Sequence, residues 1–104
     1  MNKIYRTVII DDEESAIDNL CLALKPYGQI VVEGVAHNGA AGLKLIEKVR
    51  PDLVFQDVEL PDMLGMELVT RARKKLGVNM EVVFYTAYNK YCLLYTSPSP
   101  RDTR

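Results

Sequence analysis

The chain has 104 residues, of which 48% are hydrophobic and 26% are charged. This length supports one domain with a real core, and the composition is that of an ordinary globular protein. The formal net charge of -1 gives no electrostatic basis for binding nucleic acid. No apolar run approaches the roughly 18 residues that span a bilayer. We therefore expect this segment to contact neither nucleic acid nor a membrane.

The amino terminus and the cysteines indicate a cellular setting. Met1 leads directly into an expected strand, so we expect no signal peptide. Cys21 and Cys92 form neither a disulfide framework nor a metal-binding spacing. These features favour a reduced, cytoplasmic environment. Cys21 falls on the apolar face of an expected helix, and we interpret it as a small core residue.

Short apolar runs alternate with amphipathic helical patterns along the chain. Strands are expected over residues 5–10, over 30–36 with an interruption at Glu33-Gly34, from Leu53 until the run ends at Asp57, and over 80–85. The apolar faces of the three intervening helices are expected to contain Ala16, Ile17, Leu20, Cys21 and Leu24; Ala40, Leu43, Ile46 and Val49; and Leu64, Leu68, Val69, Ala72 and Leu76. This alternation predicts an α/β fold, a parallel sheet with helices on both faces.

Several polar or sulfur-containing residues have simple structural interpretations. Asn38 is expected to cap the second helix. His37, the only histidine, has no second ligand nearby and is expected in a loop beside the second strand. We interpret Met63 and Met66 as turn-packing residues. The cations near the end of the third helix are interpreted as a solvated face that complements the helix dipole; they are Arg71, Arg73, Lys74 and Lys75.

Four functional groups follow three different strands at the same expected edge. Asp11, Asp12, Asp57 and Thr86 come where strands end, and parallel strands place those ends along one rim, where ligands bind in open α/β sheets. Simpler readings exist, since acids favour helix starts and an isolated aspartate often opens a turn. Three clustered carboxylates repel one another unless protons or a cation compensate, and Mg²⁺ prefers such oxygen ligands. Beside such an ion Asp57 can attack phosphorus and form an acyl phosphate.

The residues after the fourth strand suit the same chemistry. The Thr86 hydroxyl and the Ala87 backbone N–H are expected to bind phosphoryl oxygens, and the small Ala87 side chain lets the backbone approach. Together these motifs resemble the receiver domain of two-component response regulators. The resemblance rests on the acidic pair Asp11-Asp12, on Asp57 followed by Pro61 and Gly65, and on Thr86-Ala87, and it covers residues 5–91.

The resemblance implies a phosphorylation switch. Asp57 would accept a phosphoryl group from the phosphohistidine of a sensor histidine kinase. Mg²⁺ would be held by Asp12, Asp57 and the main-chain carbonyl of Glu59, and Asp11 would act partly through water. Thr86 would then move and reshape the nearby surface. The segment from Phe84 to Tyr91 looks like receivers that are joined to a LytTR-type DNA-binding output domain. A homodimer that depends on phosphorylation is also expected.

Two features depart from the family pattern. The family has a flavodoxin-like strand order, 2-1-3-4-5, with a lysine at the end of the fifth strand and a fifth helix after it. We expect the fifth strand and helix to be missing, and Lys90 lies too early to be that lysine. Residues 1–91 are therefore expected to form an incomplete receiver domain with an unpaired edge at the fourth strand. Residues 92–104 contain Pro98 and Pro100 and resemble a translated sequencing adapter, so we interpret them as a non-native tail in which Cys92 has no functional role.

Other functions compete with that of a phosphoacceptor module that performs no catalytic turnover. A phosphohydrolase with an aspartyl nucleophile would resemble this strand end, but the acid/base aspartate expected two residues later is Glu59 here. A receiver-like interaction module that is never phosphorylated is a third possibility. The intact set of Asp11, Asp12, Asp57 and Thr86 argues against it, whereas the missing lysine argues for it.

Overall fold

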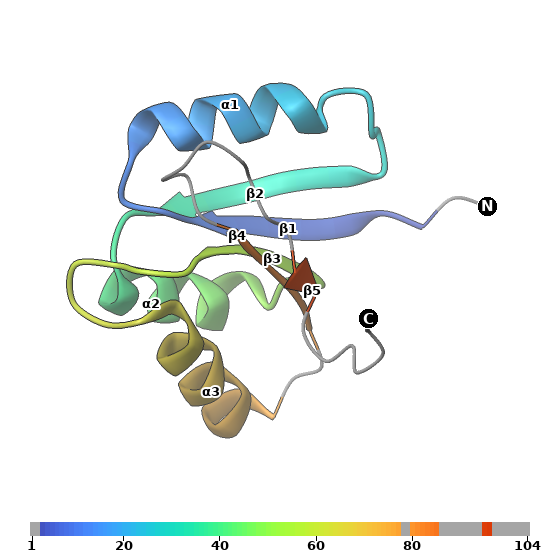
Figure 1. Ribbon diagram of the computed structural model, residues 1–104. Helices are drawn as coiled ribbons and strands as arrows, with labels where there is room; N and C mark the ends of the chain where they lie inside the picture. Colours follow the sequence, from blue (N-terminus) through green and yellow to red (C-terminus); the bar gives the residue numbers. More distant parts are fainter. Residues whose placement is uncertain (1–2, 78–79, 86–94, 97–104) are drawn as a thin grey trace, which may run out of the picture.

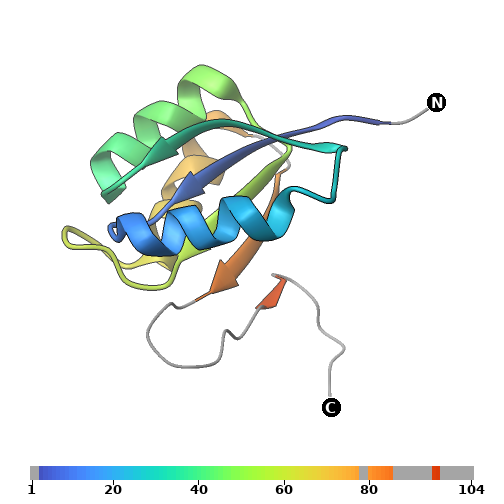
Figure 2. The ribbon, with the colours of Figure 1, turned by 90° about the horizontal axis from the view of Figure 1, so that it is seen from above.

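The computed structural model describes residues 3–77, 80–85 and 95–96. The elements in chain order are β1 (Tyr5–Ile10), α1 (Glu14–Leu24), β2 (Ile30–Ala36), α2 (Gly39–Val49), β3 (Leu53–Asp57), α3 (Gly65–Leu76), β4 (Glu81–Tyr85) and β5 (Tyr95–Thr96). The strands form one sheet in the order β2-β1-β3-β4-β5, and β1 to β4 pair in parallel. The helix α1 covers one face of the sheet and α2 and α3 cover the other (Figures 1 and 2). The predicted doubly wound α/β architecture is therefore confirmed.

Two apolar clusters lie on the two faces of the sheet. On the α1 side, the buried residues Ile9, Ile17, Phe55 and Tyr85 pack together, with Leu20, Cys21 and Leu24 partly buried against them. The larger cluster on the other side joins alternate residues of the strands to α2 and α3, including Val8, Val54, Ile46 and Leu68. The alternation of strand side chains between two covered faces explains why the strands are nearly continuous apolar runs.

The helical faces differ from the prediction at two positions. Ala40 and Leu64 were expected to point inward, but both are exposed. In α2 the buried face instead begins with Gly39 and Gly42, which carry no side chain and therefore leave no apolar signal in the sequence. Leu64 is the N-cap residue of α3 and has an extended backbone, so it lies outside the helical repeat and is 53% exposed.

Strand β2 contains a bulge at the interruption that the sequence suggests. Thr7 pairs with Val32 and Val8 pairs with Gly34, so Glu33 has no partner in the β1 ladder. A bulge of this kind changes which face later side chains occupy. Val32 packs against the α1-side cluster, whereas Ala36, an even number of residues later, is buried in the cluster on the α2 side.

The last described strand is short and antiparallel. In β5, Tyr95 pairs with Phe84 and Thr96 pairs with Val83. The expectation that β4 has an unpaired outer edge is therefore wrong at Val83 and Phe84. Within the described residues, the only strand after β4 is this antiparallel one. None of the helices in this part of the chain is long and apolar enough to cross a membrane.

Candidate functional site

The carboxyl ends of β1 and β3 bring the three predicted aspartates together. Asp57 is the last residue of β3, and Asp11 and Asp12 directly follow β1. The Asp11 backbone N–H donates to the Ala36 carbonyl at 3.0 Å, which extends the contact with β2 to this edge. Because Ile9 and Phe55 are register partners on the α1 side, strand alternation places Asp11 and Asp57 on that same side.

The three carboxylates form a compact cluster of oxygen donors. One oxygen from each of Asp11, Asp12 and Asp57 lies within 4.8 Å of the others. Three closely spaced carboxylate oxygens are ligands of the kind that a hard divalent cation such as Mg²⁺ prefers. Asp11 is fully buried, Asp57 is 8% exposed, and Asp12 is open to solvent, so the cluster extends from the interior to the surface.

The acidic cluster perturbs the titration of its central member. Burial and the nearby carboxylates of Asp11 and Asp12 together raise the pKa of Asp57 to about 7, although the hydrogen bond from the Glu59 backbone N–H acts in the opposite direction. That N–H lies 3.4 Å from Asp57 Oδ1. A carboxylate that carries its charge so unfavourably at neutral pH is one that a cation would stabilise, which agrees with the oxygen geometry.

Asp11 is held by two hydrogen bonds. The Tyr85 hydroxyl donates to Asp11 Oδ2 at 2.6 Å, and the Glu13 backbone N–H donates to Oδ1 at 2.9 Å. Burial, together with its bond to Asp11, raises the pKa of Tyr85 well above its ordinary range, so the phenol keeps its proton and acts as a donor. Tyr85 was missed at the sequence level. The available signal was an aromatic residue with a polar tip at the end of a buried strand.

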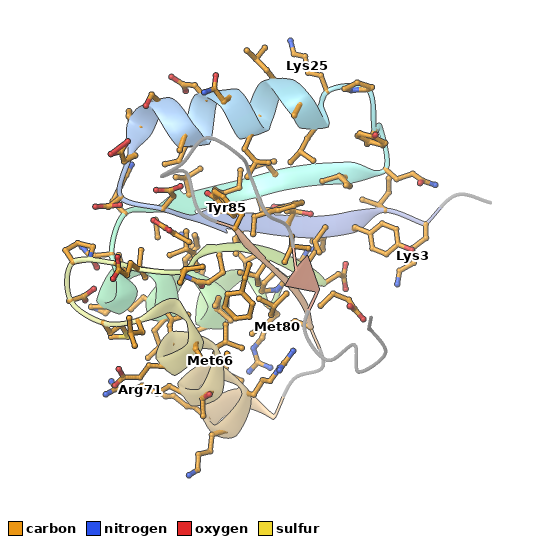
Figure 3. All side chains as sticks on the ribbon, viewed as in Figure 1. Lys3, Lys25, Met66, Arg71, Met80 and Tyr85 are labelled. Atoms are coloured by element: carbon orange, nitrogen blue, oxygen red, sulfur yellow. The ribbon has the colours of Figure 1, made fainter. Side chains whose placement is uncertain are left out.

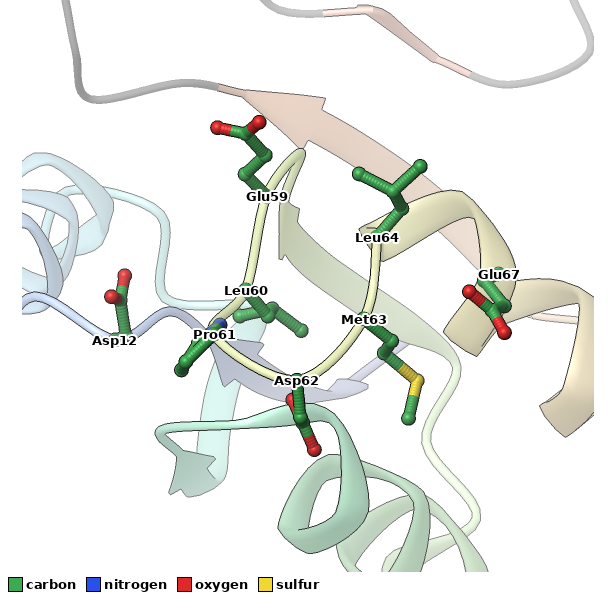
Figure 4. Close-up of a pocket in the computed structure, with 8 residues that line it drawn as sticks. All are labelled: Asp12, Glu59, Leu60, Pro61, Asp62, Met63, Leu64 and Glu67. Atoms are coloured by element: carbon green, nitrogen blue, oxygen red, sulfur yellow. The ribbon is translucent and has the colours of Figure 1, made fainter.

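A surface depression of about 490 Å³ adjoins the cluster. Its lining comes from Asp12 and from the β3–α3 loop and its flank: Glu59, Leu60, Pro61, Asp62, Met63, Leu64 and Glu67 (Figure 4). Glu59 is exposed at its edge. The Asp62 carboxylate is directed toward the start of α2 (Figure 4), where it accepts hydrogen bonds from the Gly39 and Ala40 backbone N–H groups at 2.7 and 3.0 Å. This loop anchor was also missed, because nothing in its spacing shows that the loop meets α2.

The remaining predicted residues have mixed outcomes. Thr86 and Ala87 lie outside the described residues. Asn38 caps α2 as predicted, accepting from the Ala41 N–H at 2.8 Å. His37 is exposed in the loop after β2, 3.4 Å from the exposed Glu14. Met63 packs against the core, whereas Met66 is 61% exposed, so its interpretation as a packing residue is wrong.

The cations of α3 serve structural roles at the surface. Arg71 pairs with Glu67 one helical turn earlier at 3.1 Å, and Lys75 pairs with Glu47 of α2 at 2.8 Å. Arg73 donates to the Met80 carbonyl at 2.9 Å. Arg71 is among the labelled side chains in Figure 3, far from Tyr85. The exposed ion pairs of Arg71 and Lys75 agree with the interpretation as a solvated face.

The fold and the site define an α/β domain with an acidic rim at the carboxyl edge of a parallel sheet. The family model of the response regulator receiver domain matches residues 7–95. The chain belongs to this family of receiver domains.

Curated relatives agree with this assignment. An uncharacterized response regulatory protein of Vibrio cholerae serotype O1 is 42% identical over 86 residues, which cover 83% of this chain and 35% of that protein. The transcriptional regulatory protein BtsR of Escherichia coli (strain K12) is 31% identical over 90 residues, covering 86% of this chain and 37% of BtsR. The chain thus spans about a third of the length of the curated relatives it matches.

Solved structures are also similar to this chain. The REC domain of AraT, a response regulator from Geobacillus stearothermophilus, is 28% identical with a TM-score of 0.72, over 82% of this chain and 66% of that one. A DNA-binding response regulator of the LuxR family from Staphylococcus aureus is 28% identical with a TM-score of 0.73, over 84% and 72%. These similarities confirm the receiver fold.

Proposed function

We propose that this chain is the phosphoacceptor module of a two-component response regulator and that Asp57 receives the phosphoryl group with the help of Mg²⁺. The observation that carries the proposal is the position of Asp57. It ends a central strand, is 8% exposed, and has carboxylate oxygens of Asp11 and Asp12 within 4.8 Å. The site in this proposal comprises Asp57, Thr86 and Ala87 for phosphoryl transfer, and Asp11, Asp12, Asp57 and Glu59 for the metal.

Each residue has a distinct role in the proposed transfer. A carboxylate oxygen of Asp57 attacks phosphorus, the new O–P bond forms, and the P–N bond of the kinase phosphohistidine breaks with its electron pair returning to the imidazole. When bound, Mg²⁺ compensates the charge of the carboxylates and of the phosphoryl oxygens. Asp12, Asp57 and the Glu59 carbonyl hold the ion, Asp11 acts through water, and Thr86 and Ala87 bind phosphoryl oxygens. The product is a modified protein, so the module is not a turnover enzyme.

The partners in this proposal are a sensor histidine kinase and an output domain. Two matched proteins are named as a transcriptional regulatory protein and a DNA-binding response regulator, which supports a transcriptional output. We propose an output domain of the LytTR type, switched by the phosphorylated receiver and accompanied by receiver homodimerisation. The segment described here then signals without contacting nucleic acid itself.

We also propose that residues 1–91 make up the receiver unit and that residues 92–104 are a non-native tail. The Ser/Pro-rich composition of that segment supports this boundary. The proposal predicts that a chain ending at Tyr91 binds Mg²⁺ as tightly as the 104-residue chain. The pairing of Tyr95 and Thr96 with β4 gives a clear alternative, in which removal of these residues weakens both folding and Mg²⁺ binding.

Phosphorylation by a small-molecule donor tests the main proposal. The 104-residue chain is incubated with acetyl phosphate and Mg²⁺, and its intact mass is measured. We expect one phosphoryl group on the wild-type protein and none on Asp57→Asn, because an amide is a poor nucleophile. Asp18→Asn removes one exposed acidic group of α1 and serves as the matched control. Thr86→Ala is expected to accept the phosphoryl group on Asp57, but its surface should not change in response.

Mg²⁺ titration gives an independent test of the same site. Asp12→Ala removes a proposed ligand and should weaken Mg²⁺ binding at least about tenfold, whereas Arg71→Ala should leave it unchanged. Equal phosphorylation of Asp57→Asn and wild type would disprove the acceptor assignment. Mg²⁺ binding without any phosphorylation would favour an interaction module, and rapid hydrolysis of a phosphomonoester would favour a phosphohydrolase.

A further inference from the structure

The buried carboxylate of Asp11 already has a protein donor on each oxygen. Tyr85 donates to Oδ2 at 2.6 Å and the Glu13 backbone N–H donates to Oδ1 at 2.9 Å. Asp11 has no exposed surface, so these two bonds fix its orientation relative to Asp12 and Asp57. A charged acceptor with short hydrogen bonds of this kind is held more firmly than one that faces solvent.

The Tyr85 side chain reaches its partner across an intervening strand. Tyr85 ends β4, Asp11 follows β1, and β3 lies between these strands in the sheet. Tyr85 is the register partner of Asp57, and its side chain lies on the α1 side of the sheet, where Ile9 and Phe55 also pack (Figure 3). The Tyr85 side chain therefore extends past Asp57, and its hydroxyl reaches the Asp11 carboxylate on the other side of β3.

The ring that carries this hydroxyl is buried in the apolar core. Tyr85 is 7% exposed and packs in the α1-side cluster with Ile9, Ile17 and Phe55. A rigidly packed aromatic ring is a suitable support for a hydrogen bond that orients a metal-site carboxylate, because outer-shell partners set the position and basicity of the ligands.

We propose that Tyr85 is a positioning residue of the metal site, whose hydroxyl holds Asp11 in its inner position so that Asp12 and Asp57 remain free to bind the cation directly. This inference rests on the proposed function for the identity of the cation. Tyr85 directly precedes Thr86 in the sequence. Cation binding at the site therefore acts, through Asp11 and Tyr85, on the end of β4, next to Thr86, the hydroxyl residue assigned to the switch.

Fluorine NMR of the 104-residue chain tests this inference. Tyrosine is replaced globally by 3-fluorotyrosine, and the Tyr85 signal is assigned from its absence in Tyr85→Phe. During a titration with MgCl₂ we expect the Tyr85 signal to shift in step with metal binding, which the signal of a tyrosine that is not coupled to the site would not do. Tyr85→Phe should bind Mg²⁺ at least about tenfold more weakly. Tyr27→Phe, which removes a hydroxyl from a 59% exposed ring, should bind Mg²⁺ like wild type.

The possible outcomes separate this inference from the proposed function. If wild-type protein does not bind Mg²⁺, both are overturned. If wild type binds Mg²⁺, but the Tyr85 signal stays fixed and Tyr85→Phe binds with equal affinity, only the role of Tyr85 is overturned. The signal of Tyr85 is measured in wild-type protein, so this part of the test does not depend on the folding of the variant.

Discussion

The carboxylate of Asp62 accepts a 2.7 Å hydrogen bond from the backbone N–H of Gly39, which lies 23 positions earlier in the chain. A second bond, from the Ala40 N–H, joins the other carboxylate oxygen to the same helix end. The β3–α3 loop thus supplies a cap to α2 in addition to the local cap from Asn38. Met63 reinforces the junction, because a side chain at Gly39 would collide with it. The loop beside the acidic cluster is therefore fastened to α2.

This junction leads to a prediction about Asp62. Asp62→Ala should lower the urea midpoint of unfolding at pH 7, and Asp62→Asn, which keeps one acceptor oxygen, should lower it less. The backbone donors lower the pKa of Asp62, so its contribution is present above the unfolded pKa of about 3.9 and is lost as the pH falls through the folded value. The difference between variant and wild type should therefore disappear in strong acid. A difference that stayed constant with pH would contradict a role for the charged carboxylate.

Asp57 should have the opposite pH dependence in metal-free protein. Its pKa is raised to about 7, so its folded form keeps a proton that the unfolded chain releases near pH 3.9. Wild-type stability should accordingly fall as the pH rises from about 4 through about 7. Asp57→Asn lacks this charge and should be more stable than wild type at pH 8 by about 1–2 kcal/mol. This difference is smaller than the full pKa shift implies, because solvent at the rim screens the charge. At pH 4 the difference should be small.

Urea unfolding at several pH values in the presence of EDTA measures this effect. Asp18→Asn, on the exposed side of α1, serves as the control for loss of one negative charge. Parallel pH profiles for wild type and Asp57→Asn would show that Asp57 carries its charge as readily in the folded protein as in the unfolded chain. If Mg²⁺ binds this cluster, its addition should abolish most of the stability difference at pH 8.

Gly65 should be intolerant of any side chain. It begins α3 directly against the end of β3, and a Cβ atom there would collide with the Asp57 backbone carbonyl and approach Gln56 Cγ at 3.0 Å. Because the carbonyl belongs to a central strand, Gly65→Ala should destabilise the protein by about 1–3 kcal/mol and weaken Mg²⁺ binding by displacing Asp57. Gly28→Ala is the matched control, since no atom lies within 4 Å of its added Cβ. Equal urea midpoints for the two variants would rule out this close contact.

The acidic cluster was predictable because the sequence shows where each strand ends. Asp11, Asp12 and Asp57 each follow an apolar run, and parallel pairing alone brings such ends to one edge. Tyr85 and Asp62 were not predictable in the same way. The hydroxyl of Tyr85 crosses a strand, and Asp62 meets α2 only because of the path that the loop takes, and neither of these depends on sequence spacing.

The errors in the core also have physical causes. Counting apolar residues placed Ala40 and Leu64 inside, although one lies beside a buried glycine face and the other precedes the first turn of its helix. The pairing of β5 with β4 was missed because a two-residue antiparallel strand needs no apolar periodicity. Tertiary contacts decided each of these positions, and a sequence pattern does not record them.

The bulge in β2 means that this strand is one residue longer than its pairing with β1 requires. Glu33 is the unpaired residue. The residues on either side of it already face the sides of the sheet that they would face in a regular strand without Glu33. Deleting Glu33 should therefore close the ladder without turning any core side chain outward. Deleting Val35, which is 37% exposed, should instead turn Ala36 away from the core and shift the start of α2. Thermal unfolding of the two deletion variants compares them directly, and the strand should tolerate losing a residue at Glu33 but not at Val35.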